Sequence, residues 1–361
     1  MMRTLAVVLA TLVSLLIFSP PAAAAEWMVR LEVGEQQIEG TPLSWSSSRV
    51  YLLGRDGRLW DFAPQSARNF QRTAPSFESY SAAHIRSYLI RELGSGFEVT
   101  GTGHYLVAHP RGESGVWSQR FEDLYRSFVH FFRVRGFSLS EPQFPLVAIV
   151  WPTQQDFIRY AQRDGMTGSR NVLGYYSSIS NRITLYDVGA GSGDDEAWKL
   201  NAETIIHEAT HQTAFNTGVH RRFAHTPKWV IEGLGTLFES PGVWDSLANH
   251  HASDRVNRYQ LDAFRRYAKQ GRKPGSLAHF VSDDRQFRAN VGAAYAESWA
   301  LTHFLIETRP RQYAAYMQRT AQREVFEEYP PSERLADFTA AFGNDLRLFE
   351  AHFLRFIEQI R

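Results

Sequence analysis

The chain has 361 residues, of which 43% are hydrophobic and 21% are charged. This composition is typical of a globular protein with a substantial core and excludes extensive disorder. The formal net charge is only +1, so no global basic field favours nucleic acid or anionic lipid as a partner.

Residues 1–25 have the pattern of a targeting segment. Arg3 precedes an apolar run from Leu5 to Phe18, and a Pro20-Pro21 break is followed by alanines from Ala22 to Ala25. This pattern predicts a cleaved signal peptide and a periplasmic or secreted protein with no stable membrane insertion. The apolar run is short for a bilayer span, but a retained anchor stays open as the alternative. With 0 cysteines, the sequence excludes disulfides, thiolate metal ligands and lipid attachment at cysteine.

Residues 26–72 alternate apolar and polar positions, which predicts a small β-rich module. Two such runs are Trp27 to Val33 and Arg49 to Leu53, and Arg55-Asp56-Gly57 after the second run is a hairpin turn signal. We expect this module to have a structural or docking role.

Residues 73–198 alternate helix and strand patterns, which predicts a mixed α/β part. The expected elements are a helix at 82–92, a strand at 97–108, helices at 117–134 and 154–163, a strand at 145–151, and a hairpin of strands at 175–178 and 182–186. The acidic loop Gly189–Glu196 reads as a solvated connection, and a calcium site is the alternative. From residue 199 to 361 the patterns are almost entirely helical.

The helix predicted at 203–215 carries a metal-binding motif, because His207, Glu208 and His211 have HExxH spacing. Residues four apart lie on one face of a helix, so the two imidazoles can bind one zinc ion. Glu208 then lies beside the ion, where a general base can take a proton from zinc-bound water. The alternative is that the motif arose by chance in a protein that binds no metal.

A third protein ligand is needed, and Glu232 is the best candidate. It lies on a helix expected to begin at Pro227, and Gly233 and Gly235 would allow that helix to approach the motif helix closely. Two loop histidines, His220 and His225, are alternative ligands, although solvated histidines are the more ordinary outcome. Glu239, two turns beyond Glu232, either hydrogen-bonds a ligand histidine or forms a plain ion pair.

These motifs resemble the gluzincin metallopeptidases, and most closely an uncharacterised bacterial family of predicted exported peptidases with a thermolysin-like core. The resemblance covers roughly residues 70–310 and includes the strings Asn181–Asp187, Trp229–Gly235 and Tyr295–Leu305. It implies an α+β fold in which a mixed α/β sheet layer precedes a mainly helical part. The peptidase domain would then span residues 73–361, after the N-terminal module.

Carried over residue by residue, the resemblance implies that His207, His211 and Glu232 bind one Zn²⁺. It also implies that Glu208 is the base and later the proton donor, and that the strand Arg182–Tyr186 is the edge strand above the cleft, where a peptide pairs. Thermolysin-like relatives often have an aspartate four residues after the glutamate ligand, whereas this chain has Thr236.

Tyr295 is our candidate for stabilising the oxyanion of the transition state, with His303 as the alternative. Tyr295, Trp299 and His303 follow one another at four-residue steps, so all three could face the cleft. Tyr295 could also be a packing residue only. The sequence thus predicts a zinc metallopeptidase acting on peptides or proteins.

An endopeptidase is favoured over an aminopeptidase. The resembled gluzincin aminopeptidases carry a GxMEN-like string before the HExxH motif, and this chain has no such string. The alternative from another class is a non-catalytic periplasmic binding or assembly protein that retains the fold. The sequence leaves the substrate and the oligomeric state open.

Overall fold

The computed structural model describes residues 27–112, 116–166, 172–188 and 195–361, with the side chains of 195–201 excepted. The predicted signal peptide and residues 189–194 of the predicted acidic loop lie outside the described residues. The chain divides into two compact units, the first formed by residues up to Glu78 and the second by Ser79–Arg361 together with the turn Asp56–Arg58. Within the described ranges, no helix combines the length and apolar character needed to cross a membrane.

The first unit is one antiparallel sheet with strand order β4-β3-β2-β1-β5. Its strands are β1 (Met28–Val33), β2 (Gln36–Trp45), β3 (Val50–Gly54), β4 (Leu59–Phe62) and β5 (Ala67–Ala74). Alternating side chains such as Val29, Leu31 and Leu52 bury one face of the sheet. The predicted turn after Arg55 joins β3 to β4, and Gly57 has the positive φ of +85° that such a turn requires.

The second unit begins with a five-stranded mixed sheet of order β6-β7-β8-β10-β9. The strands are β6 (Phe97–Gly101), β7 (Tyr105–Pro110), β8 (Leu146–Trp151), β9 (Gly174–Ser177) and β10 (Arg182–Tyr186). The central strands β7, β8 and β10 run parallel, while β6 and β9 pair antiparallel at the two edges. Because the three parallel strands are nearly continuous apolar runs, both faces of the sheet need a covering layer.

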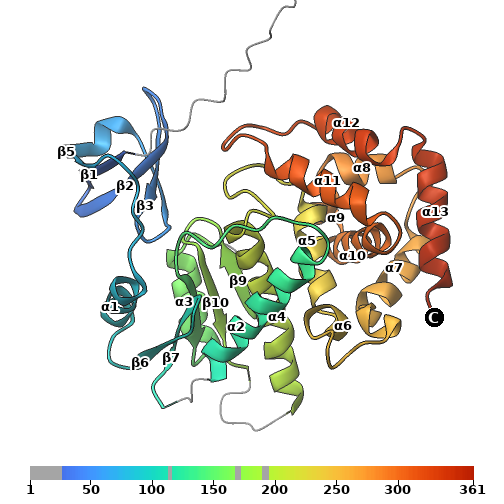
Figure 1. Ribbon diagram of the computed structural model, residues 1–361, viewed down its shortest axis with the longest axis horizontal. Helices are drawn as coiled ribbons and strands as arrows, with labels where there is room; N and C mark the ends of the chain where they lie inside the picture. The colour runs from blue at the N-terminus through green and yellow to red at the C-terminus, as the bar shows by residue number, and fades with distance from the viewer. Residues whose placement is uncertain (1–26, 113–115, 167–171, 189–194) are drawn as a thin grey trace, which may run out of the picture. The chain divides into compact units, whose positions relative to one another are not determined.

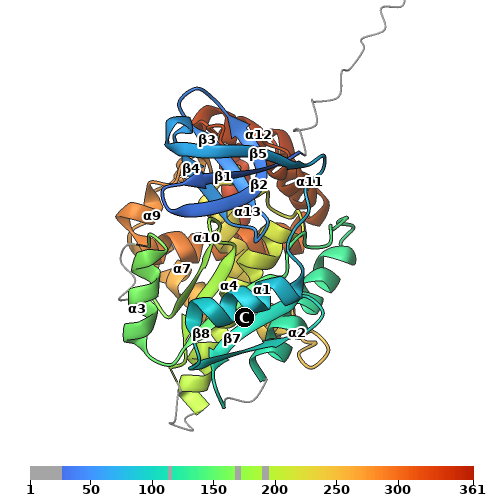
Figure 2. The ribbon, with the colours of Figure 1, turned by 90° about the vertical axis from the view of Figure 1, so that its left-hand side faces the viewer.

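Helices supply that layer on each face (Figures 1 and 2). Val107 and Ala148 point toward α2 (Val116–Arg133) and α4 (Asp195–Asn216) on one side. Their neighbours Ala108 and Val147 point toward α1 (Ala82–Leu93) on the other, where α3 (Gln154–Arg163) also packs on the sheet. The alternation follows from the two-residue period of a strand.

Two expectations about the sheet are corrected. The strand predicted at 97–108 is two antiparallel strands, β6 and β7, because Gly101-Thr102-Gly103 turns the chain and Thr102 N donates to Tyr105 O. The strand Arg182–Tyr186 is not the edge strand, since it lies between β8 and β9. The free edge on this side of the sheet belongs to β9.

The rest of the described chain is helical. Its elements are α5 (Lys228–Phe238), α6 (Pro241–Trp244), η3 (Ala252–Arg255), α7 (Arg258–Gln270), α8 (Leu277–Ser282), α9 (Gln286–Ala289), α10 (Val291–Thr308), α11 (Pro310–Ala321), α12 (Pro331–Phe342) and α13 (Leu346–Gln359). They share one large core that includes Trp229, Trp299 and Phe338. The α+β class, with a sheet layer followed by a helical part, is confirmed.

Candidate metal centre

The motif helix α4 lies between the two cores of the second unit. Ile205 and Ala209 pack on the sheet, whereas Ile206 packs among the helices. Gln212 ties the helix to the sheet, because its Nε2 donates to Val147 O at 3.1 Å and to Asn181 O at 2.8 Å. α4 is therefore held firmly on two sides, which fixes the direction of the side chains on its remaining face.

That face presents both motif histidines to one point. The Nε2 atoms of His207 and His211 are 2.9 Å apart, and their rings are nearly perpendicular, with an interplanar angle of 89°. Glu232, on α5, brings its Oε2 to 3.4 Å from His207 Nε2 and 3.5 Å from His211 Nε2. The structure thus brings together the three residues predicted as metal ligands, with all three ligand atoms within 4.8 Å of one another.

Two glycines on α5 explain how the helices come so close. A Cβ on Gly235 would lie 2.7 Å from Cε1 of His207, so only glycine leaves room for that imidazole. A Cβ on Gly233 would lie 2.7 Å from the backbone oxygen of Ser298, on α10. Gly235 thus admits the histidine from α4, and Gly233 admits a different neighbour, α10.

Glu239 supports the site from behind His207. The Nδ1 of His207 donates to Glu239 Oε1 at 2.8 Å, and Asn257 Nδ2 donates to Glu239 Oε2 at 2.7 Å. This hydrogen bond places the proton of the neutral imidazole on Nδ1 and leaves the lone pair on Nε2, the arrangement that a metal ligand needs. Thr236 has no such role, because its hydroxyl donates to Glu232 O at 2.7 Å within its own helix.

The three converging atoms fit a zinc ion. Zinc bonds of about 2.0–2.2 Å in tetrahedral geometry place ligand atoms roughly 3.4 Å apart. The two nitrogen–oxygen separations at Glu232, 3.4 and 3.5 Å, match this value, and the separation of the two Nε2 atoms, 2.9 Å, is shorter. Glu232 Oε2 is buried and has no hydrogen-bond partner among the described residues, as is also true of His211 Nδ1. A buried carboxylate oxygen aimed at two imidazole nitrogens is a donor set for a divalent cation, and for zinc in particular.

The charges of the site also favour a cation. Burial raises the pKa of Glu232, but the nearby imidazoles of His207 and His211 outweigh this effect and hold the pKa well below its ordinary value. Burial likewise lowers the pKa of His207, but contacts with Glu232 and Glu239 raise it well above the ordinary value. Both pKa shifts have the same cause, which is the closeness of the carboxylates to the imidazoles.

Glu208 stands beside the cluster and faces the sheet edge. Its Oε2 accepts a hydrogen bond of 2.7 Å from the backbone N of Tyr176, on the edge strand β9. Glu208 does not belong to the set of three converging side chains. Its carboxylate is held at the edge strand β9 by the bond with Tyr176 N.

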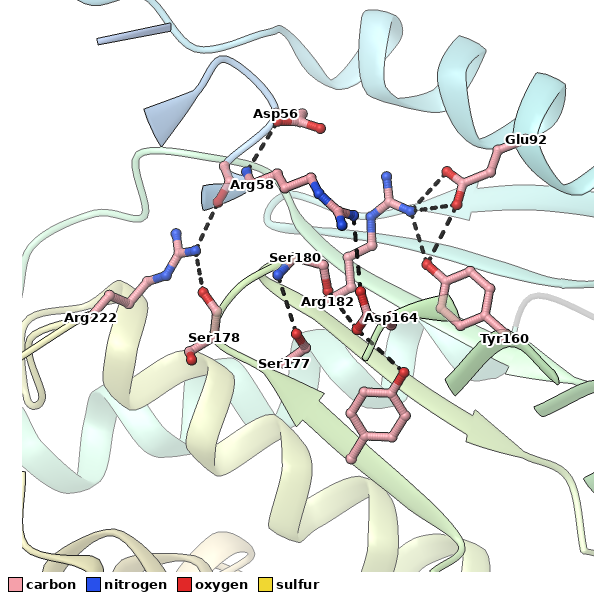
Figure 3. Close-up of polar contacts among 12 residues, drawn as sticks. Asp56, Arg58, Glu92, Tyr160, Asp164, Ser177, Ser178, Ser180, Arg182 and Arg222 are labelled. Atoms are coloured by element: carbon pink, nitrogen blue, oxygen red, sulfur yellow. Dashed lines mark hydrogen bonds and ion pairs between the residues drawn. The ribbon is translucent and has the colours of Figure 1, made fainter. Parts of the chain in front are cut away.

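The hairpin that carries this edge is anchored by polar contacts (Figure 3). Arg182 Nη1 donates to both carboxylate oxygens of Glu92, at 2.9 and 2.8 Å, and to Tyr160 Oη at 3.2 Å. Arg222 Nη2 donates to the backbone oxygen of Ser178 at 2.6 Å, in the turn between β9 and β10. These contacts hold the strand that positions Glu208.

Tyr295 borders the metal cluster, whereas its two partners on α10 do not. The Tyr295 ring stacks on that of His207 with centroids 6.2 Å apart, and burial together with the Glu232 carboxylate raises the pKa of its hydroxyl. Trp299 is fully buried in the helical core, and His303 stacks on it at 5.2 Å. The expectation that all three residues face the cleft is therefore wrong, because α10 is buried on most of its circumference.

The two alternative loop histidines have different surroundings. His225 is exposed, as expected for a loop. His220 is only 1% exposed and has no hydrogen-bond partner for either ring nitrogen among the described residues. Its ring packs at a tilt against that of Phe215, with centroids 5.2 Å apart. Burial lowers the pKa of His220 to about 3, so it is neutral and not solvated.

Two residues of the site had no signal in the sequence. Tyr176 contributes a backbone group, to which residue type gives no clue. Asn257 caps α7 by accepting from Gln260 N at 3.1 Å, and its spacing marks a helix start without revealing its second contact, with Glu239.

Comparisons with known proteins give limited matches. A family model described as a protein of unknown function (DUF1570) matches residues 201–327. No curated protein matches the chain. A solved structure of a mutant M1 zinc metallopeptidase from Deinococcus radiodurans is similar at 13% identity and a TM-score of 0.37, over 73% of this chain and 49% of that chain.

The same mutant bound to a Tyr-Ser-Ala substrate is similar at 13% identity and a TM-score of 0.36, over 69% of this chain and 48% of that chain. The present chain therefore spans about half the length of the metallopeptidase that it matches.

Proposed function

We propose that the protein is an exported zinc metallopeptidase with a thermolysin-like core, which cleaves internal bonds of peptides or proteins. The observation that carries the proposal is the convergence of His207, His211 and Glu232 on one point, with the Glu208 carboxylate beside this point and outside the set of three. A purely structural metal site has no need of an additional carboxylate in that position. Export is supported by the pattern of residues 1–25 alone.

Each residue has a role in hydrolysis. Zinc, when bound, supplies Lewis acidity that polarises a carbonyl and acidifies water. Glu208 takes the proton from the attacking water on a carboxylate oxygen and returns it to the leaving amine. Tyr295 donates its hydroxyl proton in a hydrogen bond to the developing oxyanion, and its raised pKa keeps that donor protonated at neutral pH.

Strand β9 is the proposed docking edge for the peptide. In an antiparallel pair, alternate residues direct both backbone groups away from the partner strand. Leu173 O accepts from Tyr186 N on the inner side, whereas Tyr176 N points outward to Glu208. The carbonyl of Tyr176 and both backbone groups of Gly174 then lie on the free edge, where an extended peptide can pair.

Substitution of the base tests the mechanism. Glu208→Gln keeps the shape of the side chain and removes its basicity, so we expect hydrolysis to fall by about 100-fold or more while zinc content is unchanged. The measurement is the cleavage rate of a peptide library with both ends blocked, alongside the zinc content of each protein. A zinc-loaded Glu208→Gln protein with full activity would refute this role.

Blocked ends also separate the classes of activity. An endopeptidase cleaves such peptides and is inhibited by a chelator, whereas an aminopeptidase requires a free N-terminus. A protein that binds zinc and peptide but cleaves no member of the library would be the non-catalytic alternative.

A further inference from the structure

A cavity of about 610 Å³ adjoins the metal centre along α7 and the start of α10, helices that pack on each other (Figure 1). Tyr295 is common to both places, since it lines the cavity and its ring stacks on His207. The volume of the cavity is in the range of ligand-binding pockets. The cavity therefore begins at the tyrosine that borders the candidate metal centre.

The lining of the cavity combines apolar side chains, such as Ala263 and Val291, with polar ones, and it carries one charge. Tyr259, Tyr267 and Tyr295 contribute aromatic rings, and Gln260, Gln270 and Asn290 contribute amides. Of the described residues that line it, only Arg266 carries a formal charge.

Arg266 is available to a ligand. It is exposed and forms no ion pair with another residue of the described ranges. Other arginines of the helical part are already paired, such as Arg272 with Glu297 at 2.9 Å and Arg255 with Glu307 at 3.1 Å.

The ligand that fits this lining is a carboxylate. A guanidinium binds a carboxylate with two parallel hydrogen bonds, and tyrosine hydroxyls and amides supply further donors. Glu208, Glu232 and Glu239 repel a second carboxylate at the metal centre itself, so an acidic group of the substrate is better held at a distance. A cationic group would meet Arg266 without any acidic partner in the described lining.

We propose that this cavity is a specificity subsite, in which Arg266 binds a carboxylate of the peptide substrate. The proposal rests on the proposed peptidase function. The carboxylate is either an aspartate or glutamate side chain or the C-terminus of the peptide, and the two sources share the same recognition chemistry.

Binding to the full-length Glu208→Gln protein, loaded with zinc, tests the subsite without requiring turnover. The probes are fluorescent octapeptides with blocked ends, in which one glutamate is moved along a neutral sequence, and the matching peptides with glutamine. A further pair has the neutral sequence with a free or an amidated C-terminus. We expect the carboxylate-bearing member of one pair to bind about tenfold more tightly than its neutral partner. The pair that shows the difference identifies the source.

Variants on α7 assign the preference to Arg266. Arg266→Gln should abolish the preference for the carboxylate-bearing peptide, and Arg266→Lys should retain part of it. Lys269→Gln, which removes an exposed charge elsewhere on the same helix, should leave the preference unchanged. Equal affinities for all peptides, no binding of any peptide, or a preference that survives Arg266→Gln would each overturn the proposal. If the preference is present but the wild-type protein cleaves none of the peptides, the proposed hydrolysis fails and the subsite stands.

Discussion

Glu239 orients His207 in the candidate metal centre, a role that differs in position from that of the aspartate in the relatives that the sequence resembles. Its carboxylate is held between His207 Nδ1 and Asn257 Nδ2, at 2.8 and 2.7 Å. The relatives that the sequence resembles often place an aspartate where this chain has Thr236, and here the hydroxyl of Thr236 donates to backbone oxygens of α5. The carboxylate that orients the histidine thus comes from one turn further along the same helix.

Removing that carboxylate should weaken zinc binding. Glu239→Ala frees the His207 ring to turn and lowers the basicity of its Nε2, so we expect zinc affinity to fall by about 10- to 100-fold. Thr236→Val is the matched control on the same helix and should leave the affinity unchanged. Competition with a chromophoric zinc chelator measures both. An equal loss in the two variants would show that the effect comes from general distortion of α5.

The sequence predicted which residues form the candidate site better than it predicted what their side chains contact. His207 and His211 could be chosen because helical periodicity fixes which side chains share a face. Glu232 could be chosen because Gly233 and Gly235 allow its helix to approach the motif helix closely. The sequence could not show whether Glu239 hydrogen-bonds a histidine or forms a plain ion pair, because its position also depends on Asn257, which lies further along the chain. His220 was expected to be solvated, but the fold buries it against Phe215.

Among elements, α5 determines the geometry, because it packs on both α4 and α10. Its two glycines face different neighbours, and this separates metal binding from packing. A Cβ in Gly235→Ala would lie 2.7 Å from Cε1 of His207. A Cβ in Gly233→Ala would meet Thr302 Oγ1 most closely and would lie 2.7 Å from the backbone oxygen of Ser298, both on α10.

The two substitutions should therefore have different principal effects. Gly233→Ala should lower the free energy of unfolding of the zinc-free protein by about 1–3 kcal/mol through overpacking between backbones. Gly235→Ala should chiefly weaken zinc binding, because the atom it meets belongs to a side chain that can rotate away from the metal position. Thermal unfolding with chelator present, together with zinc titration, measures the two effects. A Gly235→Ala protein with unchanged zinc affinity would contradict the close approach of α5 to His207.

The elements themselves were predicted well where the apolar pattern is long. The helices at 82–92, 117–134 and 154–163 were found within one residue of their predicted ends. The strand predicted at 97–108 failed because its turn, at Gly101-Thr102-Gly103, interrupts an otherwise continuous β pattern. Strand order is not encoded in local pattern at all, so the edge position of β9 emerged only from the fold.

For the whole molecule, the metal centre lies where the sheet layer meets the helical part. α4 contributes apolar side chains to both cores, and α5 lies within the helical core. Periodicity was sufficient to predict that a mixed α/β part precedes a helical part, and the resemblance to a known family implied the α+β class. Export and the cleavage of internal peptide bonds stay predictions, since they depend on residues 1–25 and on a substrate.

The most direct test of the central claim is the zinc-to-protein ratio, measured by elemental analysis after dialysis against a limiting zinc buffer. We predict one zinc per chain for the wild type and for Glu208→Gln, and close to none for the double variant His207→Ala/His211→Ala. A wild-type protein without zinc, or a double variant that retains one zinc per chain, would contradict the assignment of His207, His211 and Glu232 as the metal site.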